Sequence, residues 1–150
     1  MNWKSVAAED LERYGKQKKS LDSLYERISI LTDSYTALRP IASNKVPVRG
    51  DTTQIEDVML NNIVEREKLK NTYSIIKRLV KLTEKGLSNL SDYERRTLEL
   101  FYIRRQKNHV DRLMEEFGYE KSKVYNLKEK ALYNFTIGVY GLSDYYTDIV

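Results

Sequence analysis

The sequence contains no cysteine and only 2 prolines and 6 glycines in 150 residues. The absence of cysteine excludes disulfides, thiolate zinc sites and cysteine nucleophiles. The scarcity of proline and glycine favours long helices over a protein of strands and turns. No run approaches the roughly 18 apolar residues that a membrane helix requires, and residues 1–19 lack the apolar core of a signal peptide. We therefore expect a soluble, unprocessed, cytoplasmic protein with no membrane association.

Residues that could carry catalysis are also few. The only histidine, His109, has no catalytic triad or ligand set near it in the sequence, and a capping or surface role is the commoner one. Asp111, Glu115 and Glu116 fit solvated helix charges better than general acid–base catalysts, and there is no glycine-rich phosphate loop. The sequence therefore argues against an enzyme, and it indicates no catalytic residue, metal site or cofactor.

What the sequence does contain is helical periodicity. Between Leu21 and Leu38 apolar side chains recur in alternating steps of three and four, which is typical of a seam between two packed helices. The positions are Leu21, Leu24, Ile28, Leu31, Tyr35 and Leu38. Upstream, Trp3, Val6, Leu11 and Tyr14 extend this helix in weaker register. Pro40 is expected to end it, because proline disfavours the helical conformation in the residue before it. Residues 40–53 are therefore predicted to form a loop.

A second helix is predicted from about residue 54 to residue 84, ended by Gly86. One face of it carries Ile55, Met59, Ile63, Leu69, Tyr73, Ile76 and Val80. Asn62 and Arg66 interrupt this face, which could set register or partner choice instead of stability. The two long helices predict either an antiparallel hairpin within the chain or an intermolecular bundle, and both alternatives stay open.

Three shorter helices are predicted after Gly86. Ser91 followed by Glu94 forms a capping-box pattern, so a third helix should begin there, bury Leu98, Phe101 and Tyr102, and end at Arg104 and Arg105. Asn108 is expected to cap a fourth helix. The inward face of that helix is Val110, Leu113, Met114 and Phe117. Gly118 supplies a left-handed turn, and a fifth helix follows. Its buried face is Val124, Leu127, Ala131, Leu132 and Phe135.

The last two predicted helices have the layout of a helix-turn-helix, in which the second helix reads DNA. From Arg104 to Lys130 the chain carries eight basic and five acidic residues, a local +3 within a net charge of +4. Lys, Asn, Ser and Tyr side chains can donate to or accept from base edges and phosphates. The candidate DNA-binding residues are Lys121, Ser122, Lys123, Tyr125, Asn126 and Lys128 on the second helix, with Arg104, Arg105 and Lys107 before the first.

These segments resemble a known family. Residues 91–103, SDYERRTLELFYI, together with the helix-turn-helix and KEKAL at 128–132, are similar to region four of bacterial primary sigma factors. Over roughly residues 21–135 the chain resembles the ArpU/RinA-like late transcription regulators of phages that infect Gram-positive bacteria. The shared features are Glu94, Arg95 and Leu98, then Gly118-Tyr119, Val124-Tyr125 and Ala131-Leu132, and the segment 34–59 resembles the loop after the first long helix of that group. Glu120 departs from the pattern, since sigma-like modules commonly have a serine there.

The resemblance implies an all-α protein with a long N-terminal, coiled-coil-like helical hairpin and a three-helix sigma-like module. The expected domains are residues 1–86 for hairpin and oligomerisation, 87–136 for DNA binding, and a tail at 137–150. The implied function is sequence-specific regulation of transcription in a phage or prophage, with double-stranded DNA as the principal partner. Further expected partners are host RNA polymerase and a second copy of the chain in a homo-oligomer.

Two other functions remain open. The module could dock on RNA polymerase or another protein without reading DNA, or the chain could be a small subunit for phage DNA packaging, although such subunits are expected to carry the motif nearer the N-terminus. The tail holds Tyr140, Tyr145 and Tyr146, which indicate either a contact surface or a segment that folds back on the core, because tyrosine is enriched at interfaces.

Overall fold

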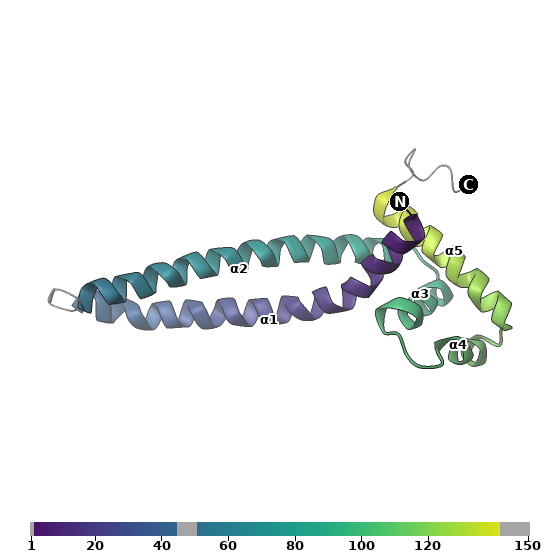
Figure 1. The fold of residues 1–150 in the computed structure, drawn as a ribbon, viewed down its shortest axis with the longest axis horizontal. Coiled ribbons are helices and arrows are strands. Elements are labelled where there is room, and N and C mark those ends of the chain that lie inside the picture. Colours follow the sequence, from purple (N-terminus) through teal and green to yellow (C-terminus); the bar gives the residue numbers. More distant parts are fainter. Residues whose placement is uncertain (1, 45–50, 142–150) are drawn as a thin grey trace. The chain divides into compact units, whose positions relative to one another are not determined.

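The computed structural model describes residues 2–44 and 51–141, and every regular element in these ranges is helical (Figure 1). The elements are α1 (Trp3–Asn44), α2 (Asp51–Ser88), α3 (Asp92–Leu98), the π-helix η1 (Glu99–Ile103), α4 (His109–Phe117) and α5 (Lys121–Tyr140). The all-α class expected from the sequence is confirmed. Among the described residues, no helix has the length and apolarity needed to span a membrane.

The predicted ends of the two long helices were wrong. Helix α1 continues through Pro40 to Asn44, and α2 begins at Asp51. Proline removes one backbone donor but does not prevent the residues after it from being helical, and here it lies near the end of the helix, where few bonds remain to be lost. The part of the predicted loop at 45–50 lies outside the described residues. Gly86 lies inside α2, which ends at Ser88.

By packing, the chain divides into two units. The first is formed by Met1–Lys18 together with Arg78–Val150, and the second by Lys19–Lys77. The sequence had instead suggested a boundary at residue 86. The difference arises because the first turns of α1 and the last turns of α2 pack with the C-terminal helices. The smaller second unit consists of the middle parts of α1 and α2 alone.

In the second unit, α1 and α2 pack antiparallel within one chain. The guanidinium of Arg27 lies 3.1 Å from the Glu65 carboxylate, and one turn further along α1 the Asn62 amide donates to the Leu31 carbonyl at 2.8 Å. The hairpin expected within the chain is therefore present in this unit. Asn62 occupies a seam position with 7% of its surface exposed, whereas Ile63, expected in the seam, is 38% exposed.

The first turns of α1 belong to the core of the first unit. Ala7 and Leu11 are fully buried and Tyr14 is nearly so. The Trp3 ring meets the Tyr133 ring of α5 edge-on, with 6.1 Å between ring centroids. The Lys4 ammonium pairs with the Glu129 carboxylate of α5 at 2.6 Å. The N-terminal helix thus stabilises the C-terminal module directly, in addition to forming one half of the hairpin.

Helices α2 and α5 cross at two glycines. A Cβ atom on Gly86 would lie 2.4 Å from Val139 Cγ2 and 2.9 Å from the Phe135 ring, and a Cβ atom on Gly138 would lie 3.0 Å from the Gly86 Cα. Real Cβ atoms essentially never come within 3.0 Å of another heavy atom, so the crossing has no room for a Cβ at Gly86, and at Gly138 the contact would be tighter than nearly all real ones. Gly86 is therefore helical and needed for reasons of space, and it does not terminate the helix as predicted.

Helix α5 also extends further than expected. It reaches Tyr140, so residues 137–140 are helical and do not belong to a tail. The Tyr140 hydroxyl donates to the Asp10 carboxylate of α1. Tyr140 therefore contacts α1 within its own unit while 43% of its surface stays exposed, and Tyr145 and Tyr146 lie outside the described residues.

Candidate nucleic-acid interface

The helix that precedes the motif is capped as predicted. The Ser91 hydroxyl accepts a hydrogen bond from the Glu94 backbone amide at 3.2 Å and donates to the Glu94 carboxylate at 3.0 Å. The other oxygen of Glu94 accepts from the Asn134 side-chain amide of α5 at 2.7 Å. Because Glu94 is only 8% exposed, this cap also joins the start of α3 to the middle of α5.

The helical stretch ends at Arg104, as predicted, but the form of its last turn was not predicted. Instead of one α-helix to Arg104, α3 passes into η1, and the Arg104 amide donates to the Glu99 carbonyl five residues earlier at 2.7 Å. The wider turn buries Leu100 at 1% exposure beside Phe101 at 7%, while Tyr102 is only half-buried. Leu100 was absent from the expected core because α-helical spacing places it away from Leu98 and Phe101.

Helix α4 begins differently from its prediction. Asn108 occupies the N-cap position, but its backbone is left-handed at φ 60° and its side chain makes no capping hydrogen bond. Asn tolerates this conformation better than most residues, so its backbone geometry is the feature that starts the helix. The inward face is as expected. Leu113 is fully buried, and Val110, Met114 and Phe117 pack against the same cluster.

The turn between the two helices of the motif forms at Gly118. Its φ is 67°, and no atom of the described residues lies within 4 Å of the position that a Cβ would take, so backbone conformation and not crowding requires glycine. The amides of Gly118 and Tyr119 both donate to the Met114 carbonyl, at 2.9 and 3.2 Å. These two hydrogen bonds satisfy the Met114 carbonyl in the last turn of α4, and the chain turns there toward α5, as the sequence predicted.

An ion pair fastens α4 to α3. The Arg96 guanidinium makes two bonds to the Glu116 carboxylate, at 2.9 and 3.1 Å, and a third to Glu99 at 3.2 Å. The hydrogen bonds from Arg96 hold the pKa of Glu116 below its usual value. The acidic residue therefore offsets a cation inside the module and is not a free negative charge on the motif.

The first turns of α5 present the candidate base-reading residues. Glu120 stands at the N-cap position without a side-chain capping bond. Lys121, Ser122, Lys123 and Asn126 are exposed, and Tyr125 is 39% exposed. Val124 is fully buried between them, which fixes the rotation of the helix. The structure thus brings five of the predicted residues onto one exposed end of α5.

One of these lysines rests on an aromatic cluster. The Lys123 ammonium lies 3.9 Å from the centroid of the Tyr119 ring. Tyr119 contacts the rings of Phe117 and Tyr93, with centroid separations of 5.7 and 6.1 Å, and Tyr93 meets Phe117 edge-on at 4.7 Å. Sequence reasoning missed this cluster, because its members come from α3, α4 and the segment between α4 and α5.

Lys128 does not belong to the exposed face. Its side chain is 18% exposed and its ammonium lies 3.4 Å from the Glu129 carboxylate. The same ammonium lies 5.6 Å from the Phe101 ring and 5.4 Å from the Tyr125 ring. The prediction that Lys128 faces outward is therefore corrected. The buried stem and ring contacts follow from its position one turn beyond Val124, on the side of Phe101.

The remaining candidates lie between η1 and α4. Arg104, Arg105 and Lys107 are exposed. Burial raises the pKa of the nearby Tyr102 hydroxyl, and the positive charge of Arg105 opposes that rise. His109, in the first turn of α4, is half-buried and packs its ring edge-on against Phe101 at 4.5 Å, a packing contact that differs from the capping or surface role expected for it.

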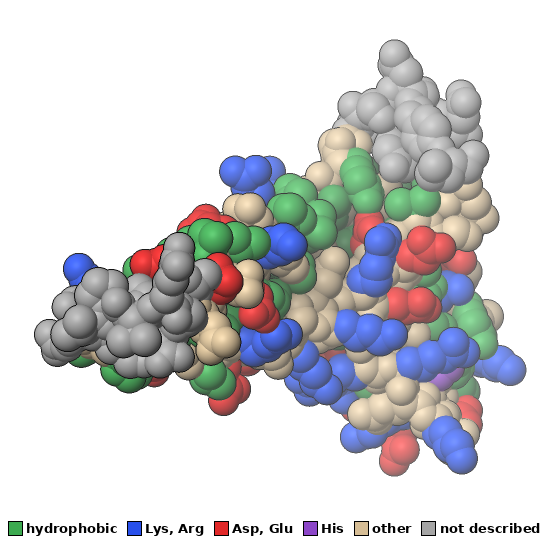
Figure 2. All heavy atoms as spheres, turned by 60° about the vertical axis from the view of Figure 1, so that its left-hand side comes forward, with side chains coloured by type: hydrophobic (Ala, Val, Ile, Leu, Met, Phe, Trp, Pro, Cys, Tyr) green, Lys and Arg blue, Asp and Glu red, His purple; other side chains and the backbone are tan. Residues whose placement is uncertain are grey.

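Positive charge is concentrated in the first unit. Its residues 1–18 and 78–150 carry 17 Lys and Arg against 14 Asp and Glu, a net +3, whereas residues 19–77 carry 9 against 8, a net +1. Figure 2 shows Lys and Arg side chains spread over the visible face of the molecule, with acidic side chains among them. The charge needed to attract a polyanion is thus in the unit that holds the motif.

Comparisons with protein-family models, curated proteins and solved structures found no match. What the site can bind therefore follows from its own geometry. Within residues 2–44 and 51–141, no three His, Cys, Asp or Glu residues are grouped so that they could hold a metal ion. The arrangement offers cations, amides and hydroxyls at the start of one helix, which suits hydrogen bonding to a polyanion and to base edges.

Proposed function

We propose that this chain binds double-stranded DNA sequence-specifically and regulates transcription, with the start of α5 lying in the major groove. The observation that carries the proposal is the exposure of Lys121, Ser122, Lys123 and Asn126 on consecutive turns after a Gly118 turn. Residues near the N-terminus of a recognition helix are the ones that usually reach base edges. The resemblance to phage late regulators suggests late genes of a phage or prophage as the target.

Each residue has a role in this proposal. Asn126 pairs with an adenine through its amide, and Ser122 contacts a base or a phosphate. Lys121 and Lys123 contact phosphates, as do Arg104, Arg105 and Lys107. Lys123 approaches the backbone from the Tyr119 ring, which holds its ammonium in place. Lys128 is assigned no contact with DNA, because its ammonium is already paired inside the module.

The hairpin unit is assigned to assembly. Several large apolar side chains on α2 are exposed there, among them Leu60 at 58%, Val64 at 45% and Ile75 at 61%. Leu60 and Val64 lie one turn apart on α2, and contiguous exposed apolar surface is typical of contacts with another macromolecule. A homo-oligomer uses this surface to present two motifs to one DNA site, and contact with host RNA polymerase is the alternative use of it.

Binding to random-sequence duplex DNA over a range of salt concentrations tests the phosphate contacts. Replacing Lys121 and Lys123 with Ala should weaken binding and lower the slope of log K against log salt by up to about 0.9 for each lost contact. The matched control replaces Lys19 and Lys68, two exposed lysines of the hairpin unit, and should leave the slope unchanged. An unchanged slope in the first variant would remove these lysines from the interface.

Selection from a library of random duplexes tests sequence specificity. The full-length chain should enrich one motif, and Asn126→Ala should relax the preference at one base position by about 1–3 kcal/mol. Asn71→Ala, an exposed asparagine in the middle of α2, serves as the control. If the wild-type chain enriched no sequence, a module that contacts proteins without reading DNA would be the better description.

A further inference from the structure

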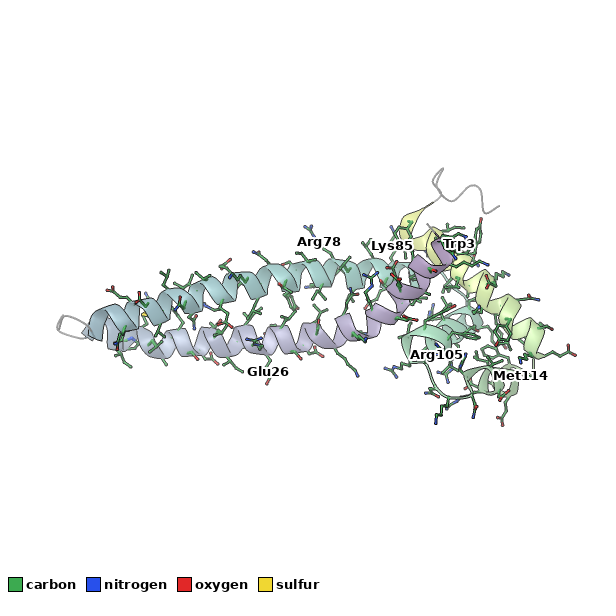
Figure 3. The ribbon with its side chains drawn as sticks, in the orientation of Figure 1. Trp3, Glu26, Arg78, Lys85, Arg105 and Met114 are labelled. Carbon is green, nitrogen blue, oxygen red and sulfur yellow. The ribbon has the colours of Figure 1, made fainter. Side chains whose placement is uncertain are left out.

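A second basic surface lies at the end of α2, away from the motif in the sequence. It consists of Arg78, Lys81 and Lys85, which we call the α2 basic face. Their spacing of three and four residues places them on one side of the helix, and all three are exposed. Figure 3 labels Arg78 and Lys85 on the same side of α2. All three belong to the unit that contains the motif.

Among the described residues, no acidic side chain neutralises this face. Glu84 is the only acid between Arg78 and Ser88, and it is directed toward α1, where it accepts from the Tyr14 hydroxyl at 3.2 Å and lies 4.0 Å from the Lys18 ammonium. Within the part of the chain that the structure describes, none of the three basic residues forms an ion pair. The charge on the face is therefore available to an external anion.

Stabilisation of the helix end does not account for these cations. The Arg95 guanidinium donates to the carbonyls of Leu87 and Leu90, each at 3.2 Å, so a cation already occupies the C-terminal end of α2. The favourable effect of basic residues on the helix dipole is restricted to the last turn. It covers Lys85 at most, and Arg78 and Lys81 lie one or more turns further back.

The face is also firmly connected to the recognition helix. Lys85 precedes Gly86, whose Cα lies against Gly138 of α5 in the close crossing of the two helices. From there to Lys121 is 17 residues of α5, or about 25 Å at 1.5 Å per residue. A duplex carries one negative charge per about 1.7 Å of its axis, so one DNA molecule offers many phosphates over a length equal to that part of α5.

We propose that the α2 basic face is a second phosphate-binding surface for duplex DNA, separate from the motif. This inference rests on the proposed function for the identity of the anion as DNA. An acidic protein surface is the rival occupant, and the salt dependence of DNA binding distinguishes the two. Contacts of this kind position a protein on the duplex and add affinity without reading sequence.

The test measures binding of the full chain to a random-sequence duplex as a function of salt. The variant replaces Arg78, Lys81 and Lys85 with Ala, and its control replaces Lys19, Lys68 and Lys70, which removes the same charge from exposed positions of the hairpin unit. Circular dichroism should show unchanged helix content for both. The slope of log K against log salt should fall by between about 1 and about 2.7 in the first variant only.

Combination with the motif variant separates the two proposals. If both surfaces contact DNA, the slope changes of the α2 variant and of Lys121→Ala with Lys123→Ala should add. A slope that falls only in the motif variant overturns the second surface and leaves the proposed function standing. A slope that falls only in the α2 variant supports the inference and shows that Lys121 and Lys123 of the motif do not contact DNA phosphates. If the wild-type chain binds no duplex at any salt concentration, both fail.

Discussion

The glycine at the crossing of α2 and α5 offers the sharpest test of the packing that positions α5. Gly86→Ala adds one methyl group inside a helix. In open space this substitution stabilises a helix by about 1 kcal/mol. At Gly86 the added carbon would lie 2.4 Å from Val139 Cγ2 and 2.9 Å from the fully buried Phe135 ring. The gain in helix propensity and the steric cost oppose one another, and the larger of the two decides whether the variant is more or less stable than the wild type.

The steric cost should exceed the gain in helix propensity. Overpacking a core by one methyl group costs about 1–3 kcal/mol, and distances this short place Gly86 at the upper end of that range. After subtraction of the propensity gain, the variant should be less stable by about 2 kcal/mol. That corresponds to a fall in Tm of roughly 4–8 °C for a chain of this size.

Urea unfolding followed by tryptophan fluorescence is a suitable assay. Trp3 is the only tryptophan and packs against Tyr133 of α5, so its emission reports the unit that contains the crossing. Gly15→Ala is the matched control in α1. Its Cβ would lie 3.4 Å from the Ile103 carbonyl oxygen, an ordinary contact, so the propensity gain should remain and the variant should be more stable by up to about 1 kcal/mol.

A double variant identifies the responsible contact. Val139→Ala removes the atom closest to the added methyl group, so Gly86→Ala should cost less in that background, with a coupling of about 0.5 kcal/mol or more. A Gly86→Ala chain as stable as the wild type would refute the argument from crowding. Equal destabilisation by Gly15→Ala would show that glycine is needed in these helices for some other reason.

Two further predictions concern polar residues. Because Arg96 holds the pKa of Glu116 below its ordinary 4.5, the ion pair should stabilise the fold above that pH and lose its effect as the pH falls through the lowered pKa. By urea midpoint, Glu116→Gln should be less stable than the wild type at pH 7 and equal to it in strong acid. The exposed control Glu115→Gln should differ from the wild type at neither pH. Asn62→Leu should raise the free energy of unfolding by about 1 kcal/mol, measured by urea unfolding followed by circular dichroism, because the Asn62 Oδ1 is buried without a hydrogen-bond partner among the described residues. Exposed Asn61→Leu should bring no gain. A destabilised Asn62→Leu chain would show that the bond to Leu31 matters more.

Local signals in the sequence were sufficient for the helices of the motif. Ser91 and Gly118 act where they were expected to act, because a cap and a left-handed turn involve only the few residues around them. The inward residues of α4 and α5 were also correct, since helical periodicity alone defines an apolar face. The exposure of Lys121, Ser122, Lys123 and Asn126 follows from the same periodicity.

Most of the errors share one cause, which is packing between segments far apart in the chain. Gly86 signalled a helix end, but Phe135 and Val139 of α5 are what require a glycine there. The sequence predicted that Lys128 is exposed, but in the structure its ammonium lies 5.6 Å from the ring of Phe101, a residue of the π-helical turn. Asn108 is a different case, because nothing near it in the sequence signals that its backbone, and not its side chain, starts α4.

The sequence by itself determined that the chain is helical, that Gly118 joins two short helices and which residues the start of α5 exposes, because these depend on interactions within one helix or one turn. Only the tertiary structure decided that the start of α1 belongs with the motif, that two glycines allow α2 and α5 to cross, and that Lys128 points inward. Those features depend on the space left by neighbouring helices, and a single sequence does not record which helices become neighbours.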